Sequence, residues 1–147
     1  MLLAVVAVIL LIPVAGLATL SLLSRRPENL GVADGRLGDC PASPNCISSR
    51  APDLEHAIAP IKYEGLPQAA LMRLQEAIKK IPRARIVRQD GSYLHVEARS
   101  RIFRFVDDLE FLMDPGLGII HLRSAARAGY SDFGVNRKRM EAIRREF

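Results

Sequence analysis

Between residues 85 and 126, apolar and polar side chains alternate in four runs, and short sequences typical of turns separate these runs. The runs 85–89, 93–99, 102–113 and 119–126 have the period of two that places apolar residues on one face of a strand. Asp90-Gly91 is a strong signal for a two-residue hairpin, and the glycine-rich stretch 114–118 is a second turn. This region therefore predicts an antiparallel four-stranded meander with one covered face.

Two amphipathic segments flank these runs. Over residues 67–81, Pro67 suits a first helical turn and Pro82 stops the helix. The second helix is predicted over residues 134–147, with Ser131 or Asp132 as its cap. The order of helix, four strands and helix predicts an α+β two-layer sandwich with two helices on one face of the sheet.

Residues 2–23 carry no charged side chain. As a helix this segment would span roughly 33 Å, enough for a hydrocarbon core of about 30 Å. A cleaved signal peptide is the alternative, because Gly16-Leu17-Ala18 offers a small-residue cleavage site. The favoured organisation is an N-terminal transmembrane helix in residues 1–23, a linker in residues 24–39 and a globular α+β domain in residues 40–147.

The chain has two cysteines, Cys40 and Cys46, in a loop that also contains Pro41 and Pro44. The favoured interpretation is a disulfide, which requires an oxidising compartment. Two buried thiols, half of a zinc site and a redox-active pair stay open, although the spacing is unusual for the last two. No metal and no cofactor is predicted. Arg25 and Arg26 follow the apolar segment and favour a cytoplasmic flank, whereas a disulfide favours the opposite side of the membrane.

Charged residues interrupt the predicted sheet in two ways. Asp107 lies in register with apolar neighbours, so it needs a β-bulge or a basic partner from the surrounding arginines. Alternation also gathers polar residues on the other face: His95, Glu97, Arg99, Arg104, Asp108, Glu110, His121 and Arg123. That face is compatible with a solvated ion-pair lattice, with a pocket for an anion, or with a hydrolytic site built on Asp107, Asp108 and His121.

Residues 124–137 connect the last strand to the last helix, and they are the best candidate anion site in the sequence. Glycines permit close backbone approach, and a helix start supplies free N–H groups. A tight structural corner is the alternative interpretation. The candidate ligand-binding residues are Arg104, Asp107, Asp108, Glu110, Arg123, Ser124, Arg127, Asp132, Asn136 and Arg137. The net charge is +5, but aromatic residues make up only 5% of the chain, so nucleic acid is not an expected partner.

Four segments together resemble a known family. They are CPASPNCISS from Cys40, SRIFRFVDDLEF from Ser100, IHLRSAAR from Ile120 and DFGVNR from Asp132. Over roughly residues 30–147 the chain resembles the family catalogued as domain of unknown function 1499. The resemblance implies a bacterial or plastid protein, often with a membrane or export segment, and no established activity. Ala126 departs from the serine that the resemblance leads us to expect, and alanine has no hydroxyl group to contribute at that position.

These observations predict a membrane-anchored binding or accessory domain of the cell envelope. It would recognise an anionic small molecule, a lipid headgroup or a partner protein through its Arg/Asp-rich site, and would contact membrane lipid through residues 2–23. Enzymatic activity is not favoured. The alternatives are a hydrolase using Asp107, Asp108 and His121, or a structural subunit of a membrane-protein complex. The expected location is the bacterial inner membrane, single-pass, with the soluble domain in the periplasm.

Overall fold

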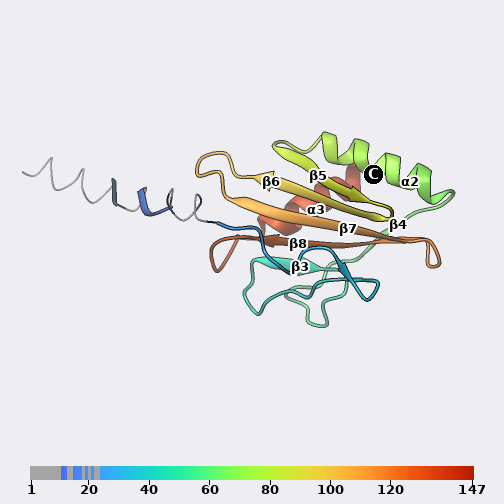
Figure 1. Cartoon of the computed structure of the whole chain (residues 1–147), viewed down its shortest axis with the longest axis horizontal. Helices are drawn as coiled ribbons and strands as arrows, with labels where there is room; N and C mark the ends of the chain where they lie inside the picture. The colour runs from blue at the N-terminus through green and yellow to red at the C-terminus, as the bar shows by residue number, and fades with distance from the viewer. Residues whose placement is uncertain (1–10, 13–14, 18, 20, 22–23) are drawn as a thin grey trace, which may run out of the picture.

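The computed structural model describes residues 11–12, 15–17, 19, 21 and 24–147 (Figure 1). A two-stranded sheet pairs β1 with β2, and a six-stranded antiparallel sheet holds the other strands. The elements are β1 (Val32–Ala33), β2 (Arg36–Leu37), β3 (Cys46–Ser48), β4 (Ile61–Lys62), α2 (Pro67–Lys79), β5 (Ala84–Asp90), β6 (Tyr93–Arg99), β7 (Val106–Asp114), β8 (Ile119–Ala126) and α3 (Val135–Glu146).

The strand order of the large sheet is β3-β8-β7-β6-β5, and β4 also pairs with β8. The predicted four-stranded sheet is therefore wrong, because β3 and β4 extend the sheet beyond β8. Cys46 pairs with Ala125 and Ile61 pairs with Ile120, so both short strands satisfy backbone groups on one edge of β8. They contain three and two residues, which is too short for apolar and polar alternation to be visible.

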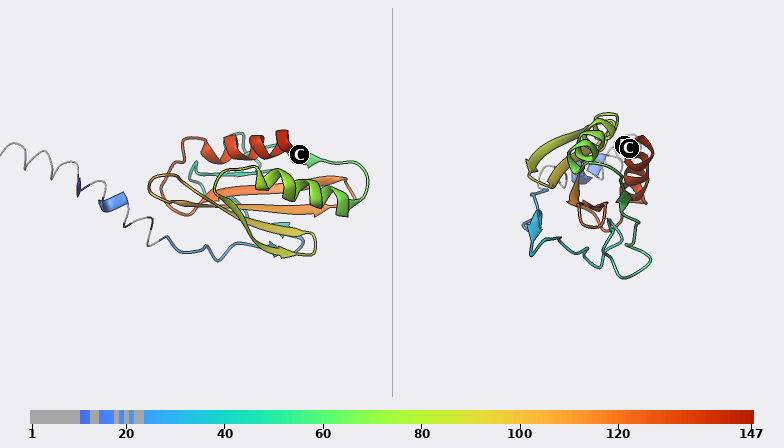
Figure 2. Two further views of the ribbon diagram at one scale, coloured as in Figure 1. Left: turned by 90° about the horizontal axis from the view of Figure 1, so that it is seen from above. Right: turned by 90° about the vertical axis from the view of Figure 1, so that its right-hand side faces the viewer.

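Helices α2 and α3 cover the same face of the sheet (Figure 2). Pro67 begins α2, as the sequence predicts. The core between helices and sheet is aliphatic, with one large aromatic ring at its centre. Its fully buried members include Leu74, Ile78, Leu94, Val96, Leu109, Phe111, Ile120, Leu122, Met140 and Ile143.

The segment before β3 covers the opposite face of the sheet. Leu37 packs against Tyr93 and Leu112 in a small apolar cluster, and the Gly31 N–H donates to Glu110 Oε1 at 2.7 Å. Residues 24–39, predicted as a linker, thus contain β1 and β2 and dock on the domain. The face of the sheet predicted to be polar is consequently an interior surface.

No helix among the described residues is long and apolar enough to cross a membrane. This finding contradicts the predicted transmembrane helix and the predicted single-pass inner-membrane location. The rest of the predicted segment, residues 1–10, 13–14, 18, 20 and 22–23, lies outside the described residues.

Strand β7 begins at Val106, four residues later than predicted. Residues 100–105 instead form a closed loop, in which Ser100 N donates to the Phe105 carbonyl and Phe105 N donates to Ser100 Oγ, both at 2.9 Å. Arg104 lies in this loop with a φ of +57°. The alternation of residues 102–105 resembles a strand, but the backbone turns there and removes Arg104 from the polar face.

Candidate functional site

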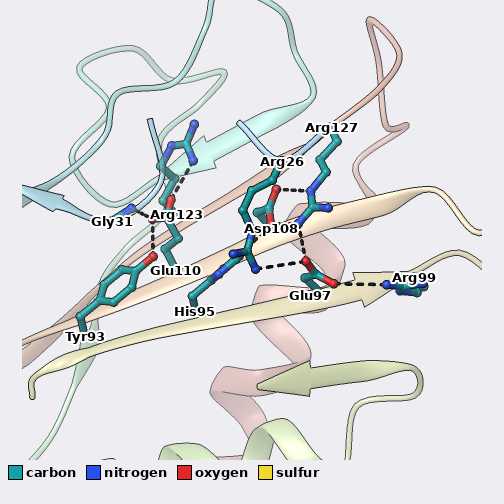
Figure 3. Close-up of polar contacts among 10 residues, drawn as sticks. All are labelled: Arg26, Gly31, Tyr93, His95, Glu97, Arg99, Asp108, Glu110, Arg123 and Arg127. Carbon is teal, nitrogen blue, oxygen red and sulfur yellow. Dashed lines mark hydrogen bonds and ion pairs between the residues drawn. The ribbon is translucent and has the colours of Figure 1, made fainter. Parts of the chain in front are cut away.

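A buried ion-pair network occupies the polar face of the sheet (Figure 3). Asp108, on β7, accepts hydrogen bonds from Arg127 Nε at 2.8 Å and from Arg127 Nη2 at 2.7 Å. His95 Nε2 lies 2.7 Å from Asp108 Oδ1, and Arg127 Nη2 also donates to Glu97 Oε1 at 2.5 Å. Asp108 is only 1% exposed, so these partners replace water completely.

Electrostatics keeps this part of the network ionised. Burial raises the pKa of Asp108, but hydrogen bonds from Arg127 and His95 outweigh it and hold that pKa below its usual value. Glu97 has a lowered pKa for the same reason, with Arg127 and Arg99 as its donors. Hydrogen bonds to Asp108 and Glu97 in turn raise the pKa of Arg127. The charges compensate one another inside the protein.

Glu110 is the centre of the second part of the network and is 0% exposed. It accepts hydrogen bonds from Arg123 Nη1 and the Tyr93 hydroxyl, both at 2.8 Å, and from Gly31 N. Burial and the adjacent carboxylate raise the pKa of Tyr93. These contacts fasten the N-terminal segment to the sheet and use all the carboxylate oxygens of Glu110.

Asp107 points to the opposite, helix-covered face of the sheet. The pairing of β7 with β6 and β8 is continuous, so no bulge is present there. Its basic partner is Arg139 on α3, at 2.8 Å, and not one of the arginines considered from sequence. Burial raises the pKa of Asp107, although Arg139 opposes this effect.

The predicted hydrolytic residues are not brought together. His121 pairs across the sheet with Leu112, whereas Asp108 pairs with Ala125, four residues further along β8. That separation is about 13 Å along the strand. Asp107 lies on the other face, so the three side chains do not form one site.

His121 instead contacts two residues of the loop after β3. Arg50 Nη2 lies 3.0 Å from its Nε2, and Ser49 Oγ lies 3.2 Å from its Nδ1. Burial and the charge of Arg50 lower the pKa of His121. Because Arg50 can only donate, Nε2 is the acceptor and Nδ1 carries the hydrogen. His121 therefore cannot take a proton from Ser49 in this arrangement.

The predicted anion site at the start of α3 is occupied from within the chain. The Asp132 carboxylate accepts the N–H of Gly134 at 3.0 Å and of Asn136 at 2.7 Å. Arg137 donates to the backbone carbonyls of Ala57 and Glu55. The free N–H groups and the cation expected to hold an anion thus stabilise the fold.

The cysteine loop is tied to this corner. Cys40 and Cys46 form the predicted disulfide, with 5.6 Å between their Cα atoms. The neighbouring Asn45 donates from Nδ2 to the Gly129 carbonyl, and its own carbonyl accepts Asn136 Nδ2 at 3.2 Å. Asn136 also accepts a hydrogen bond from the buried Ser124 hydroxyl. These motif residues hold loop, strand and helix together.

A second surface collects several arginines, of which Arg99 also takes part in the network. A hollow of about 390 Å³, here called the arginine pocket, is lined by Arg83, Ala84, Arg85, Glu97, Arg99, Ser100, Arg101 and Arg104. Among the described residues, Arg85, Arg101 and Arg104 have no ion-pair partner. Of the predicted ligand-binding residues, only Arg104 lines this pocket.

The sequence contains a partial signal for the pocket arginines that it did not predict as site residues. Arginines recur between residues 83 and 104, but only the β5–β6 hairpin brings the two ends of this run to one surface. Arg83 is held there by its own hydrogen bond from Nε to the Arg99 carbonyl, at 3.0 Å. The register of the hairpin shifts between Ile86 and Arg88, so counting residues outward from the turn does not predict which residues of β5 and β6 pair.

A larger hollow, of about 550 Å³, lies beside the disulfide loop. Its lining contains two arginines, Arg36 and Arg50, and two aspartates, Asp39 and Asp53, so it lacks the excess of arginines seen in the arginine pocket. His56 lies there with its Nδ1 2.7 Å from Asp53 Oδ1, a contact that raises the pKa of His56. Within the part of the chain that the structure describes, no group of three His, Cys, Asp or Glu residues is placed to hold a metal ion.

Fold and site together define a small α+β domain with a buried ion-pair network, a disulfide-closed loop and an exposed arginine pocket. The family model described as "Protein of unknown function (DUF1499)" matches residues 36–147, which is most of the chain. The chain belongs to this family. Searches of curated proteins and of solved structures gave no match.

Proposed function

We propose that this domain is a non-enzymatic binding module for an anionic ligand and that the arginine pocket receives the anionic group. One observation carries the proposal: five guanidinium groups surround the pocket, and its one carboxylate, Glu97, is already paired with Arg127 and Arg99. The planar guanidinium fork matches the oxygens of phosphate and carboxylate. A phosphate or carboxylate group would neutralise the positive charge of arginines that have no ion-pair partner within the described residues.

Backbone conformation supports the same surface. Arg83 and Arg104 have φ values of +58° and +57°, in the left-handed region that favours glycine. Such residues cost about 1–3 kcal/mol each and concentrate at ligand sites. Two of the four described non-glycine residues with positive φ therefore line this one pocket.

Calorimetric titration of the full chain with pyrophosphate tests the proposal. We expect binding that weakens as salt is added, because the contacts are exposed to solvent. Arg101→Glu and Arg104→Glu should each lower the affinity at least tenfold, since losing one charged contact costs about 1.4 kcal/mol or more.

Arg145→Glu is the matched control. Arg145 is exposed on the last turn of α3 and lies outside the pocket lining, so the variant has the same net charge as the other two. It should bind pyrophosphate almost as well as the unmodified chain. Equal affinity in all three variants, or no binding to the unmodified chain, would contradict the proposal.

A further inference from the structure

A second hollow adjoins the arginine pocket. It has a volume of about 460 Å³ and shares four lining residues with the pocket: Arg83, Arg99, Ser100 and Arg101. The remainder of its lining comes from the turn before β5, the start of β7 and the first three turns of α3. We call this hollow the apolar groove.

Four aliphatic side chains line the apolar groove. Ile81 and Pro82 lie on one side, and Val135 and Ala142 of α3 lie on the other. Val135 is 44% exposed although it is a large apolar side chain. The groove therefore presents hydrocarbon to water directly beside a cluster of cations, an arrangement that a soluble surface does not require.

The groove also has ionic groups in its lining. Asp107 and Arg139 also line it, but they pair with each other at 2.8 Å and are about nine-tenths buried. Among the described residues three lining cations have no ion-pair partner: Arg83 and Arg101 lie at the end that the groove shares with the arginine pocket, and Lys138 lies on α3. Aliphatic side chains and unpaired cations thus line one continuous surface, with Lys138 as a cation on the α3 wall.

We infer that the ligand is an amphiphilic anion, whose phosphate or carboxylate head binds in the arginine pocket and whose aliphatic tail lies in the apolar groove. This inference rests on the proposed function and specifies the ligand class. The arginines neutralise the head, and the aliphatic side chains remove the tail from water.

Titration with methyl, butyl and hexyl phosphate, each below its micelle concentration, tests the inference on the full chain. The head group is constant, so any gain in affinity reports the tail. Burial of a methylene is expected to raise affinity by about two- to fourfold, depending on how fully it is covered.

Ala142→Gln fills the apolar groove with a neutral, polar side chain that a helix accepts readily. It should abolish the gain with chain length and leave methyl phosphate binding unchanged. Ala69→Gln makes the same change on α2, outside both hollows, and should keep the full gain.

The outcomes separate this inference from the proposed function. If methyl phosphate binds but chain length has no effect, or if the gain persists in Ala142→Gln, the amphiphile inference is overturned and anion binding stands. If no alkyl phosphate binds, both fail. Vesicles that contain phosphatidic acid distinguish the two sources of such a ligand. If the chain sediments with the vesicles and Ala142→Gln prevents this, the ligand is a bilayer lipid. If the chain does not sediment but its affinity for alkyl phosphates rises with chain length, the ligand is a free amphiphile.

Discussion

Replacing Arg123 with methionine tests whether the buried network stabilises the fold. Methionine replaces the aliphatic part of the arginine side chain but lacks its guanidinium group and its charge. Glu110, which is 0% exposed, would keep only the Tyr93 hydroxyl and the Gly31 N–H as donors. Removing one partner of a buried ion pair typically costs about 3–5 kcal/mol, so Arg123→Met should lower the free energy of unfolding by that amount.

Urea unfolding followed by circular dichroism measures this change. With a slope of about 2 kcal/mol per molar urea, the midpoint should fall by roughly 1.5–2.5 M. Arg99→Met is the matched control on the same face of the sheet. The Arg99 side chain is 47% exposed and pairs with Glu97 at 3.3 Å, so its loss should cost at most about 1 kcal/mol.

A double variant measures the cost of leaving the buried Glu110 carboxylate without its cation. In the double variant Glu110→Gln, Arg123→Met, the amide oxygen still accepts from Tyr93 and Gly31, but no buried charge remains. The double variant should therefore be more stable than Arg123→Met alone. Equal costs for Arg123→Met and Arg99→Met, or a double variant less stable than the single one, would refute the reasoning.

Three further predictions concern the loop, the disulfide and Glu97. The Asp53 hydrogen bond raises the pKa of His56 above 6.5, so this contact stabilises the fold fully below pH 6.5 and its contribution is lost as pH rises through the folded-state pKa; thermal melts across pH 6–9 should show this loss, and His56→Gln should remove it. Reduction of Cys40–Cys46 opens a short loop and should cost about 2 kcal/mol in urea unfolding, whereas a Cys40→Ser, Cys46→Ser variant should not respond to reductant. Glu97→Gln should lower stability by about 1–3 kcal/mol yet strengthen pyrophosphate binding several-fold, because the pocket loses its one carboxylate; weaker binding in calorimetry would count against the arginine pocket.

Alternation along the strands predicted much of the ion-pair network. It placed Glu97, Asp108, Glu110 and Arg123 on one face, and the register pairs Glu110 directly with Arg123. It did not predict that this face is buried. The segment that covers it docks through single contacts, such as the Gly31 N–H, and single contacts leave no periodic signal.

The sequence also did not predict ion-pair and strand partners that lie far away along the chain. Asp107 was correctly identified as a carboxylate in an apolar row, but its partner Arg139 is chosen by how α3 packs on the sheet. Similarly, β3 and β4 join the sheet by long-range pairing with β8, which local sequence does not encode. Local patterns predicted which residues share a face, and tertiary packing determined what lies opposite them.

The segment that starts at Ser100 contributes to both the buried network and the arginine pocket. Its second half places Asp108 and Glu110 in the buried network, where arginines on neighbouring elements hold them. Its first half is the closed loop that carries Arg101 and Arg104 into the arginine pocket. Glu97 joins the two regions, because it accepts from Arg127 in the network and from Arg99 at the pocket. The network thus fixes the strand from which this loop emerges, and under the proposed function a loop already held in place lowers the ordering cost of binding an anion.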